Sequence, residues 1–133
     1  MREWATGARE RGLRVIIAAA GKAAHLAGVV AAFTPLPIVG VPMKTSDLGG
    51  MDSLLSMVQM PSGVPVACVA IGGAKNAAIY ATQILATADS RYVRVMEDFK
   101  RDMAEGFYIK KFFNLGFDKI QTYEAIKKAC KTI

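Results

Sequence analysis

The chain has 133 residues, a length that fits one domain, and its 53% share of hydrophobic residues excludes a disordered composition. The formal net charge of +6 suits nucleic acid, a membrane surface or an anionic small molecule, and it is equally compatible with a plainly solvated surface. Many of the basic residues lie after Arg91 in stretches of mixed charge, such as residues 91–101, which favour a solvated surface over a nucleic-acid surface. No apolar run reaches the length of a membrane span. We therefore expect neither a nucleic-acid nor a membrane partner.

Short apolar runs alternate with helical patterns along the first two-thirds of the chain. In chain order the pattern predicts a helix over Trp4–Arg11, a strand over Leu13–Ala18, a helix over Ala23–Phe33, a strand over Pro37–Pro42, a helix over Met51–Met60, a strand over Val64–Ile71 and a helix over Ala74–Ala86. Near-continuous apolar strands are typical of a parallel sheet covered on both faces. The alternation therefore predicts an α/β domain with a parallel sheet.

The remainder, Asp89–Ile133, shows no strand pattern and predicts two amphipathic helices with a break near Asn114-Leu115-Gly116. We therefore divide the chain into a domain over residues 1–88 and a helical segment over residues 89–133.

The two cysteines have no metal-ligand spacing. Cys68 lies in an apolar run and is expected to be a small buried residue, whereas Cys130 lies among lysines. With only one histidine in the chain, no metal site is predicted. Reduced cysteines favour a cytoplasmic location.

Ligands of open parallel sheets bind at the carboxyl ends of the strands, so three segments are of interest. They are the first turn (residues 20–26), the second loop (residues 42–50) and the third turn (residues 72–76). In the first turn, Gly21 would let the backbone approach a ligand closely. His25, the single histidine, lies in the first turn of the next helix; it is either a hydrogen-bonded structural residue or a substrate contact.

The string AAHLAG over residues 23–28 and the string TPLPIVGVPMKTSDLGG over residues 34–50 carry a resemblance to a known family. They resemble the 5-(carboxyamino)imidazole ribonucleotide mutase family, also described as the catalytic subunit of phosphoribosylaminoimidazole carboxylase. Residues 14–28, RVIIAAAGKAAHLAG, resemble the family segment that contains AGAGGAAHLPG. Residues 34–72, TPLPIVGVPMKTSDLGGMDSLLSMVQMPSGVPVACVAIG, are similar to the adjoining family segment almost position for position. The resemblance covers roughly residues 4–88 and favours the bacterial, plant and fungal branch over the animal-type carboxylases.

The resemblance implies a flavodoxin-like three-layer fold and a cytoplasmic homo-oligomer, usually an octamer. The implied reaction moves a carboxylate from the exocyclic nitrogen to a ring carbon of an aminoimidazole ribonucleotide, with no metal or organic cofactor. Carried over by residue, a substrate-binding set would comprise Ala20, Gly21, Lys22, His25, Leu26, Met60 and Pro61. His25 is the catalytic candidate, and Met60 and Pro61 are expected to reach a neighbouring subunit's site.

The chain departs from the family pattern at several positions. Ala19 and Lys22 stand where the family usually has glycine, and Ala27 stands where it usually has proline. The Lys22 side chain would point either to solvent or into the carboxylate pocket. The family's first two strands, its phosphate-binding loop and the loop with its main acid/base histidine have no counterpart here. We therefore expect an amino-terminally truncated relative that is inactive alone, with the edge of the strand over Leu13–Ala18 unpaired.

Two other functions remain open at this point. One is a non-catalytic, truncated paralogue that acts as an interaction or assembly subunit. The other is a basic module that binds an anionic polymer through the carboxyl-terminal segment. Residues 107–133 resemble nothing that assigns them a function.

Overall fold

The computed structural model describes residues 1–104 of the chain. They fall into two compact units, Met1–Ala81 and the residues from Thr82 onward, and each is described by itself.

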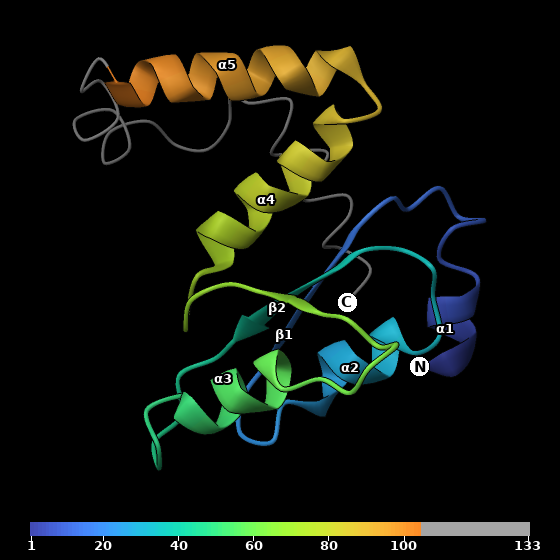
Figure 1. Ribbon diagram of the computed structural model, residues 1–133, viewed down its shortest axis with the longest axis vertical. Coiled ribbons are helices and arrows are strands. Elements are labelled where there is room, and N and C mark those ends of the chain that lie inside the picture. Colours follow the sequence, from blue (N-terminus) through green and yellow to red (C-terminus); the bar gives the residue numbers. More distant parts are fainter. Residues whose placement is uncertain (105–133) are drawn as a thin grey trace. The chain divides into compact units, whose positions relative to one another are not determined.

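The first unit alternates helices with strands, as the sequence predicts (Figure 1). Its elements are α1 (Arg2–Thr6), β1 (Ile16–Ala20), α2 (His25–Ala31), β2 (Ile38–Pro42), α3 (Met51–Val58), β3 (Ala67–Cys68) and the first part of α4 (Ala74–Ala86).

The three strands form one parallel sheet in the order β1-β2-β3. Ile16 pairs with Ile38, Ala20 pairs with Pro42, and Val39 pairs with Ala67. This is the order of the last three strands of a flavodoxin-like sheet. The expected α/β class with a parallel sheet is confirmed.

Several elements are shorter than predicted, for local reasons. The first helix ends at Thr6, and residues 7–12 form turns that end at Gly12, whose φ is +88°. The second helix begins at His25 rather than at Ala23, because Ala24 has a φ of +40°, which a right-handed helix cannot contain. The third strand is limited to the two residues of β3.

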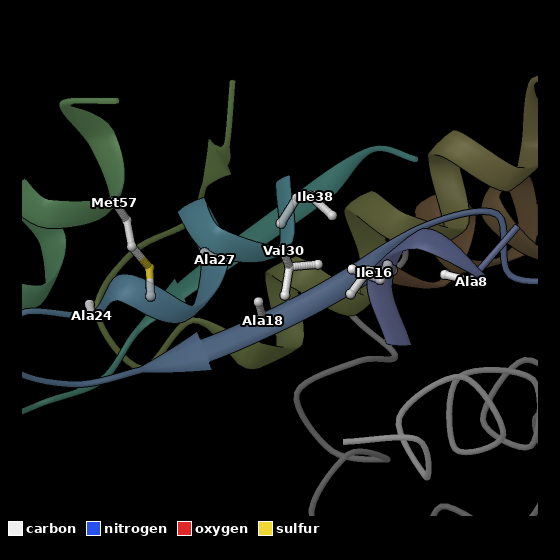
Figure 2. Close-up of a cluster of buried hydrophobic side chains, with 9 residues drawn as sticks. Ala8, Ile16, Ala18, Ala24, Ala27, Val30, Ile38 and Met57 are labelled. Carbon is white, nitrogen blue, oxygen red and sulfur yellow. The ribbon is translucent and has the colours of Figure 1, made fainter. Parts of the chain in front are cut away.

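The core of this unit lies between the sheet and the helices α1, α2 and α3. Ile16 and Ala18 of β1 are buried in it with Ala27 and Val30 of α2, whereas Ala19, the next residue of the strand, is exposed. Met57 of α3 joins the same cluster, where Figure 2 shows it beside α2. Gly40, in the middle of β2, makes this possible: a Cβ there would lie 3.1 Å from the Met57 sulfur and 2.9 Å from a Val66 methyl.

Strand β1 has one unpaired edge among the described residues, since it pairs only with β2. The amide of Ile16 donates to the Pro37 carbonyl, and the Ala20 carbonyl accepts from the Met43 amide. Because backbone groups alternate in direction along a strand, the amides and carbonyls of Ile17 and Ala19 point to the other side. The expected unpaired edge is present, and no charged side chain of β1 protects it.

The second unit contains the end of α4 and α5 (Ser90–Ala104). Asp89 caps α5 by accepting the Arg91 amide at 2.9 Å, and its hydrogen bonds with the Arg91 guanidinium lower the pKa of that carboxyl. A helix after residue 89 was predicted; the predicted break at Asn114–Gly116 and Cys130 lie outside the described residues. The division of the chain at residue 88 stays a prediction. Through residue 104, the structure has no helix with the length and apolarity that crossing a membrane requires.

Candidate functional site

The first turn, the second loop and the third turn lie along the carboxyl edge of the sheet. The Met43 amide donates to the Ala20 carbonyl at 2.9 Å, which joins the end of β1 to the start of the second loop. The Gly72 amide donates to the Pro42 carbonyl at 2.8 Å, which joins the third turn to the end of β2. These two bonds fix the three segments at the place where ligands of parallel sheets bind.

The first turn has an unusual backbone. Lys22 has a φ of +55° and Ala24 a φ of +40°, both in the left-handed region that favours glycine. The turn is closed by the Ala24 amide, which donates to the Gly21 carbonyl at 3.0 Å. Gly21 itself packs against the second loop, since a Cβ on it would lie 3.3 Å from a Thr45 methyl. Backbone strain of this kind persists only where the surroundings impose it, and it gathers at ligand sites.

His25 and Leu26 begin α2 directly after this turn. His25 is exposed, so its imidazole is accessible to a ligand, whereas Leu26 is half-buried against the core. Ala24, the residue before the helix, supplies no side-chain cap.

The second loop is held by its own side chains. The Thr45 hydroxyl donates to Asp52 Oδ1 at 3.0 Å and accepts the Gly50 amide at 3.2 Å. The Ser53 hydroxyl lies 2.8 Å from the Met43 carbonyl and 2.9 Å from the Gly50 carbonyl. Because these bonds cross the loop, its two ends have fixed positions.

The third turn packs against the second loop through Ile71, the residue before it. A Cβ on Gly50 would lie 2.8 Å from an Ile71 methyl, so only glycine leaves room for this contact. Neighbouring Cys68 is partly rather than fully buried, and desolvation raises the pKa of its thiol.

The ammonium of Lys22 lies near the second loop. Its Nζ is 3.8 Å from Asp47 Oδ2, with 76% of the lysine side chain and 68% of the aspartate side chain exposed. A pair this exposed contributes at most about 1 kcal/mol to stability. In this structure Lys22 therefore points into solvent and bridges two segments of the site.

Met60 and Pro61 follow α3. The Met60 side chain lies over Gly28, one helical turn after His25 in the same chain: a Cβ on Gly28 would be 2.7 Å from the Met60 methyl. Pro61 is exposed. Met60 is thus close to α2 of its own chain, and its expected reach into a neighbouring subunit stays a prediction.

Three polar residues of this edge were not singled out from the sequence: Thr45, Asp47 and Ser53. The cluster of threonine, serine, aspartate and glycine before α3 did predict a loop. Which hydroxyl bonds which carbonyl depends on contacts between Met43 and Ser53, ten positions apart, which no local pattern specifies.

The arrangement brings an imidazole, an ammonium and a carboxylate to one edge of a parallel sheet. An imidazole can accept and donate a proton, and an ammonium can hold an anion. Within residues 1–104 no three histidine, cysteine, aspartate or glutamate side chains come together in a way that could hold a metal ion.

The fold and this edge define a parallel α/β protein with a candidate ligand site at the carboxyl ends of its strands. The sequence pattern of the AIR carboxylase family matches residues 1–106, which is most of the chain. The chain belongs to this family.

Relatives with curated names support the same assignment. The chain is 54% identical to the N5-carboxyaminoimidazole ribonucleotide mutase of Synechocystis sp. over 103 residues, covering 77% of this chain and 58% of the relative. It is 56% identical to the mutase of Thermotoga maritima over 103 residues, covering 77% of this chain and 60% of the relative. It is 59% identical to the phosphoribosylaminoimidazole carboxylase of Schizosaccharomyces pombe over 102 residues, covering 77% of this chain and 18% of the relative. The chain spans about three-fifths of the length of these mutases.

Proposed function

We propose that this chain acts in purine biosynthesis as part of an N5-carboxyaminoimidazole ribonucleotide mutase. The enzyme would convert 5-carboxyaminoimidazole ribonucleotide to 4-carboxy-5-aminoimidazole ribonucleotide by moving a carboxylate from the exocyclic nitrogen to a ring carbon. The observation that carries the proposal is the identity of more than half of the residues to curated mutases over 103 residues, beside a family match over residues 1–106 that contains all three segments of the candidate site.

The residues of the first turn would line the nucleobase and the carboxylate. The backbone of Ala20 and Gly21 and the side chain of Leu26 would contact the base. His25 would take part in proton transfer, since it is exposed at the start of α2, directly after the first turn. Lys22 would offer its ammonium to an anionic group of the substrate, and Met60 and Pro61 would approach the pocket from the region after α3. No cofactor is required by these roles.

We expect no turnover by this chain alone. His25 is its only histidine, so one imidazole would have to perform every proton transfer, and the chain spans about three-fifths of the length of the mutases it matches. The experiment measures mutase turnover for the purified chain. It also tests a chimera in which the amino-terminal part of the Thermotoga maritima mutase precedes Trp4.

The expected result is no turnover by the chain and measurable turnover by the chimera. The matched control is the chimera with His25→Asn, which should fold and lose activity. A chimera that folds, binds no ribonucleotide and shows no turnover would contradict the proposed function. Full turnover by the chain alone would contradict only its proposed incompleteness.

The protein is further proposed to form a cytoplasmic homo-oligomer, an octamer as the family resemblance implies. What supports self-association is the orientation of α3. This helix buries Ser53 together with Met57 and exposes a stripe of large apolar residues: Met51, Leu55 and Val58. An apolar face at solvent is typical of a subunit interface. Light scattering should give a mass well above that of one chain, and Leu55→Lys should lower it.

A non-catalytic assembly subunit is the second candidate, favoured by the unpaired edge of β1. An unprotected edge with Ile17 and Ala19 groups available can pair with a strand of another chain. Mixing the chain with a complete mutase separates the two functions. An assembly subunit should co-elute with the complete enzyme and change its mass without adding active sites.

A further inference from the structure

The ion pair between Lys22 and Asp47 joins the first turn to the second loop across the candidate site. Both side chains are mostly in water, and their charged atoms are 3.8 Å apart. A pair of this kind is weak and screened by salt. Another anion that reaches Lys22 can therefore replace the Asp47 carboxylate.

The backbone of Lys22 is held independently of that pair. Its left-handed φ of +55° lies in a turn that is closed by the hydrogen bond between Ala24 and Gly21. Gly21 in turn packs close to Thr45. The lysine side chain thus starts from a fixed point between Ala20 and His25, while its four-carbon stem leaves the ammonium free to turn.

Asp47 is also placed by contacts other than the ion pair. It lies in the exposed middle of the second loop, whose ends are fixed by the hydrogen bonds of Thr45 and Ser53. The Ser46 hydroxyl donates to Asp47 Oδ1 at 3.2 Å and leaves Oδ2 toward Lys22. The loop therefore keeps a carboxylate beside the ammonium whether or not the two interact.

We propose that Asp47 is a positioning residue, which holds the Lys22 ammonium at the rim of the site and yields it to an anionic group of the ligand. The inference rests on the proposed function, since the ligand's phosphate or carboxylate is that of an aminoimidazole ribonucleotide. Asp47 competes with this anion for Lys22. It therefore lowers ligand affinity, and the competition weakens as salt concentration rises.

The test is a chemical-shift titration of the full chain with two probes, 4-carboxy-5-aminoimidazole ribonucleotide and inorganic phosphate. Each titration follows the backbone amides of Lys22 and Asp47 at low and high salt. The variants are Asp47→Asn, Lys22→Gln, the double variant and Asp47→Glu, which restores the carboxylate. Glu10→Gln is the matched control, because it removes one negative charge from the turn that precedes β1, at the opposite end of that strand.

Asp47→Asn should tighten anion binding about two-fold at low salt and less at high salt, as expected for removal of an exposed ion pair. Asp47→Glu and Glu10→Gln should bind like the unaltered chain. In the Lys22→Gln background, Asp47→Asn should change nothing, because no ammonium remains to be released.

Two results would overturn the inference: an equal gain from Asp47→Asn with and without Lys22, or no gain at all. An equal gain would mean that Asp47 acts only by long-range repulsion. Failure of the proposed function looks different. In that case phosphate binding still depends on the pair while the ribonucleotide binds no better than phosphate. If neither probe binds, both proposals are wrong.

Discussion

The first turn and the second loop lie at the same edge of the sheet but are built in different ways. In the second loop the left-handed positions are occupied by glycine, Gly49 with a φ of +64° and Gly50 with a φ of +101°. In the first turn they are occupied by Lys22 and Ala24. The second loop is crossed by side-chain hydrogen bonds, whereas the first turn is closed by a backbone bond from the Ala24 amide to the Gly21 carbonyl. The second loop therefore has a sequence suited to its shape, and the first turn is held in its shape by its neighbours.

The largest effect on stability is expected from Gly50→Ala, which changes a glycine of the second loop. The new Cβ would meet an Ile71 methyl at 2.8 Å and the Met43 carbonyl at 3.1 Å, in a backbone conformation that alanine rarely adopts. Strain and overpacking together should lower the free energy of unfolding by about 2–4 kcal/mol. Urea unfolding measures this. Gly49→Ala is the control: its φ is also positive but its Cβ meets nothing within 4 Å, so it should cost only about 1 kcal/mol.

A smaller loss is expected from Ser53→Ala. The Ser53 side chain is fully buried, and its hydroxyl serves the carbonyls of Met43 and Gly50. Its removal leaves the Gly50 and Met43 carbonyls without that donor, one of them in a buried bond, which should cost about 1–2 kcal/mol. Ser56→Ala, on the exposed side of α3, should leave the unfolding free energy within about 0.5 kcal/mol. Equal losses from both changes would show that the buried hydroxyl does not hold the loop.

In the first turn, a change to glycine should stabilise the protein, whereas in the second loop a change from glycine should destabilise it. Lys22→Gly removes the strain of a left-handed backbone, which costs a residue with a side chain about 1 kcal/mol. Glycine also makes the unfolded chain more flexible, and this offsets part of the gain in stability. A net stabilisation of about 0.5 kcal/mol is expected. Ala23→Gly, one position on, has no positive φ to relieve and should destabilise the protein. If both glycines destabilise equally, the surroundings do not strain Lys22.

The same position can be probed for function in a complete homologue. Replacing the glycine that corresponds to Lys22 by lysine brings the ammonium to an active site that is known to turn over. Changed affinity or turnover is expected, because the stem fills space that glycine leaves open. Unchanged values for both would make the lysine side chain a bystander.

The smallest effect on stability is expected from Asp47→Asn. The pair with Lys22 is exposed, so its loss should change the free energy of unfolding by less than about 0.5 kcal/mol. Asp98→Asn breaks a similarly exposed pair with Arg101 in α5 and should behave alike. A loss above 1 kcal/mol specific to Asp47 would mean that the carboxylate supports the loop rather than tunes Lys22.

Much of the fold could be predicted from local pattern. The helix α4 begins and ends at the predicted residues, and three strands alternate with helices in the predicted order. The first and last residues of the other helices and strands were harder to predict. β3 is much shorter than the apolar run over Val64–Ile71, because an apolar run marks burial and not the extent of pairing. The start of α2 moved to His25 because two residues before it have positive φ, which no propensity of lysine or alanine predicts.

The location of the candidate site could be predicted from the sequence, but the contacts between its side chains could not. That the segments after the strands share one edge follows from parallel topology alone. The roles of Ala20, Gly21, His25 and Leu26 came from family resemblance, and they remain predictions that ligand binding will test.

The sequence by itself determined the α/β class and the family, and it predicted the segments of the candidate site, because apolar periodicity, glycine placement and matching strings are all local features of the chain. Only the tertiary structure decided the environment of Lys22. Its ammonium lies beside Asp47, 25 positions away in the chain, because the parallel pairing of β1 with β2 brings the two following segments together. The same pairing set Gly21 against Thr45 and left the other edge of β1 open among the described residues, since which groups meet across a sheet depends on register and not on neighbouring residues.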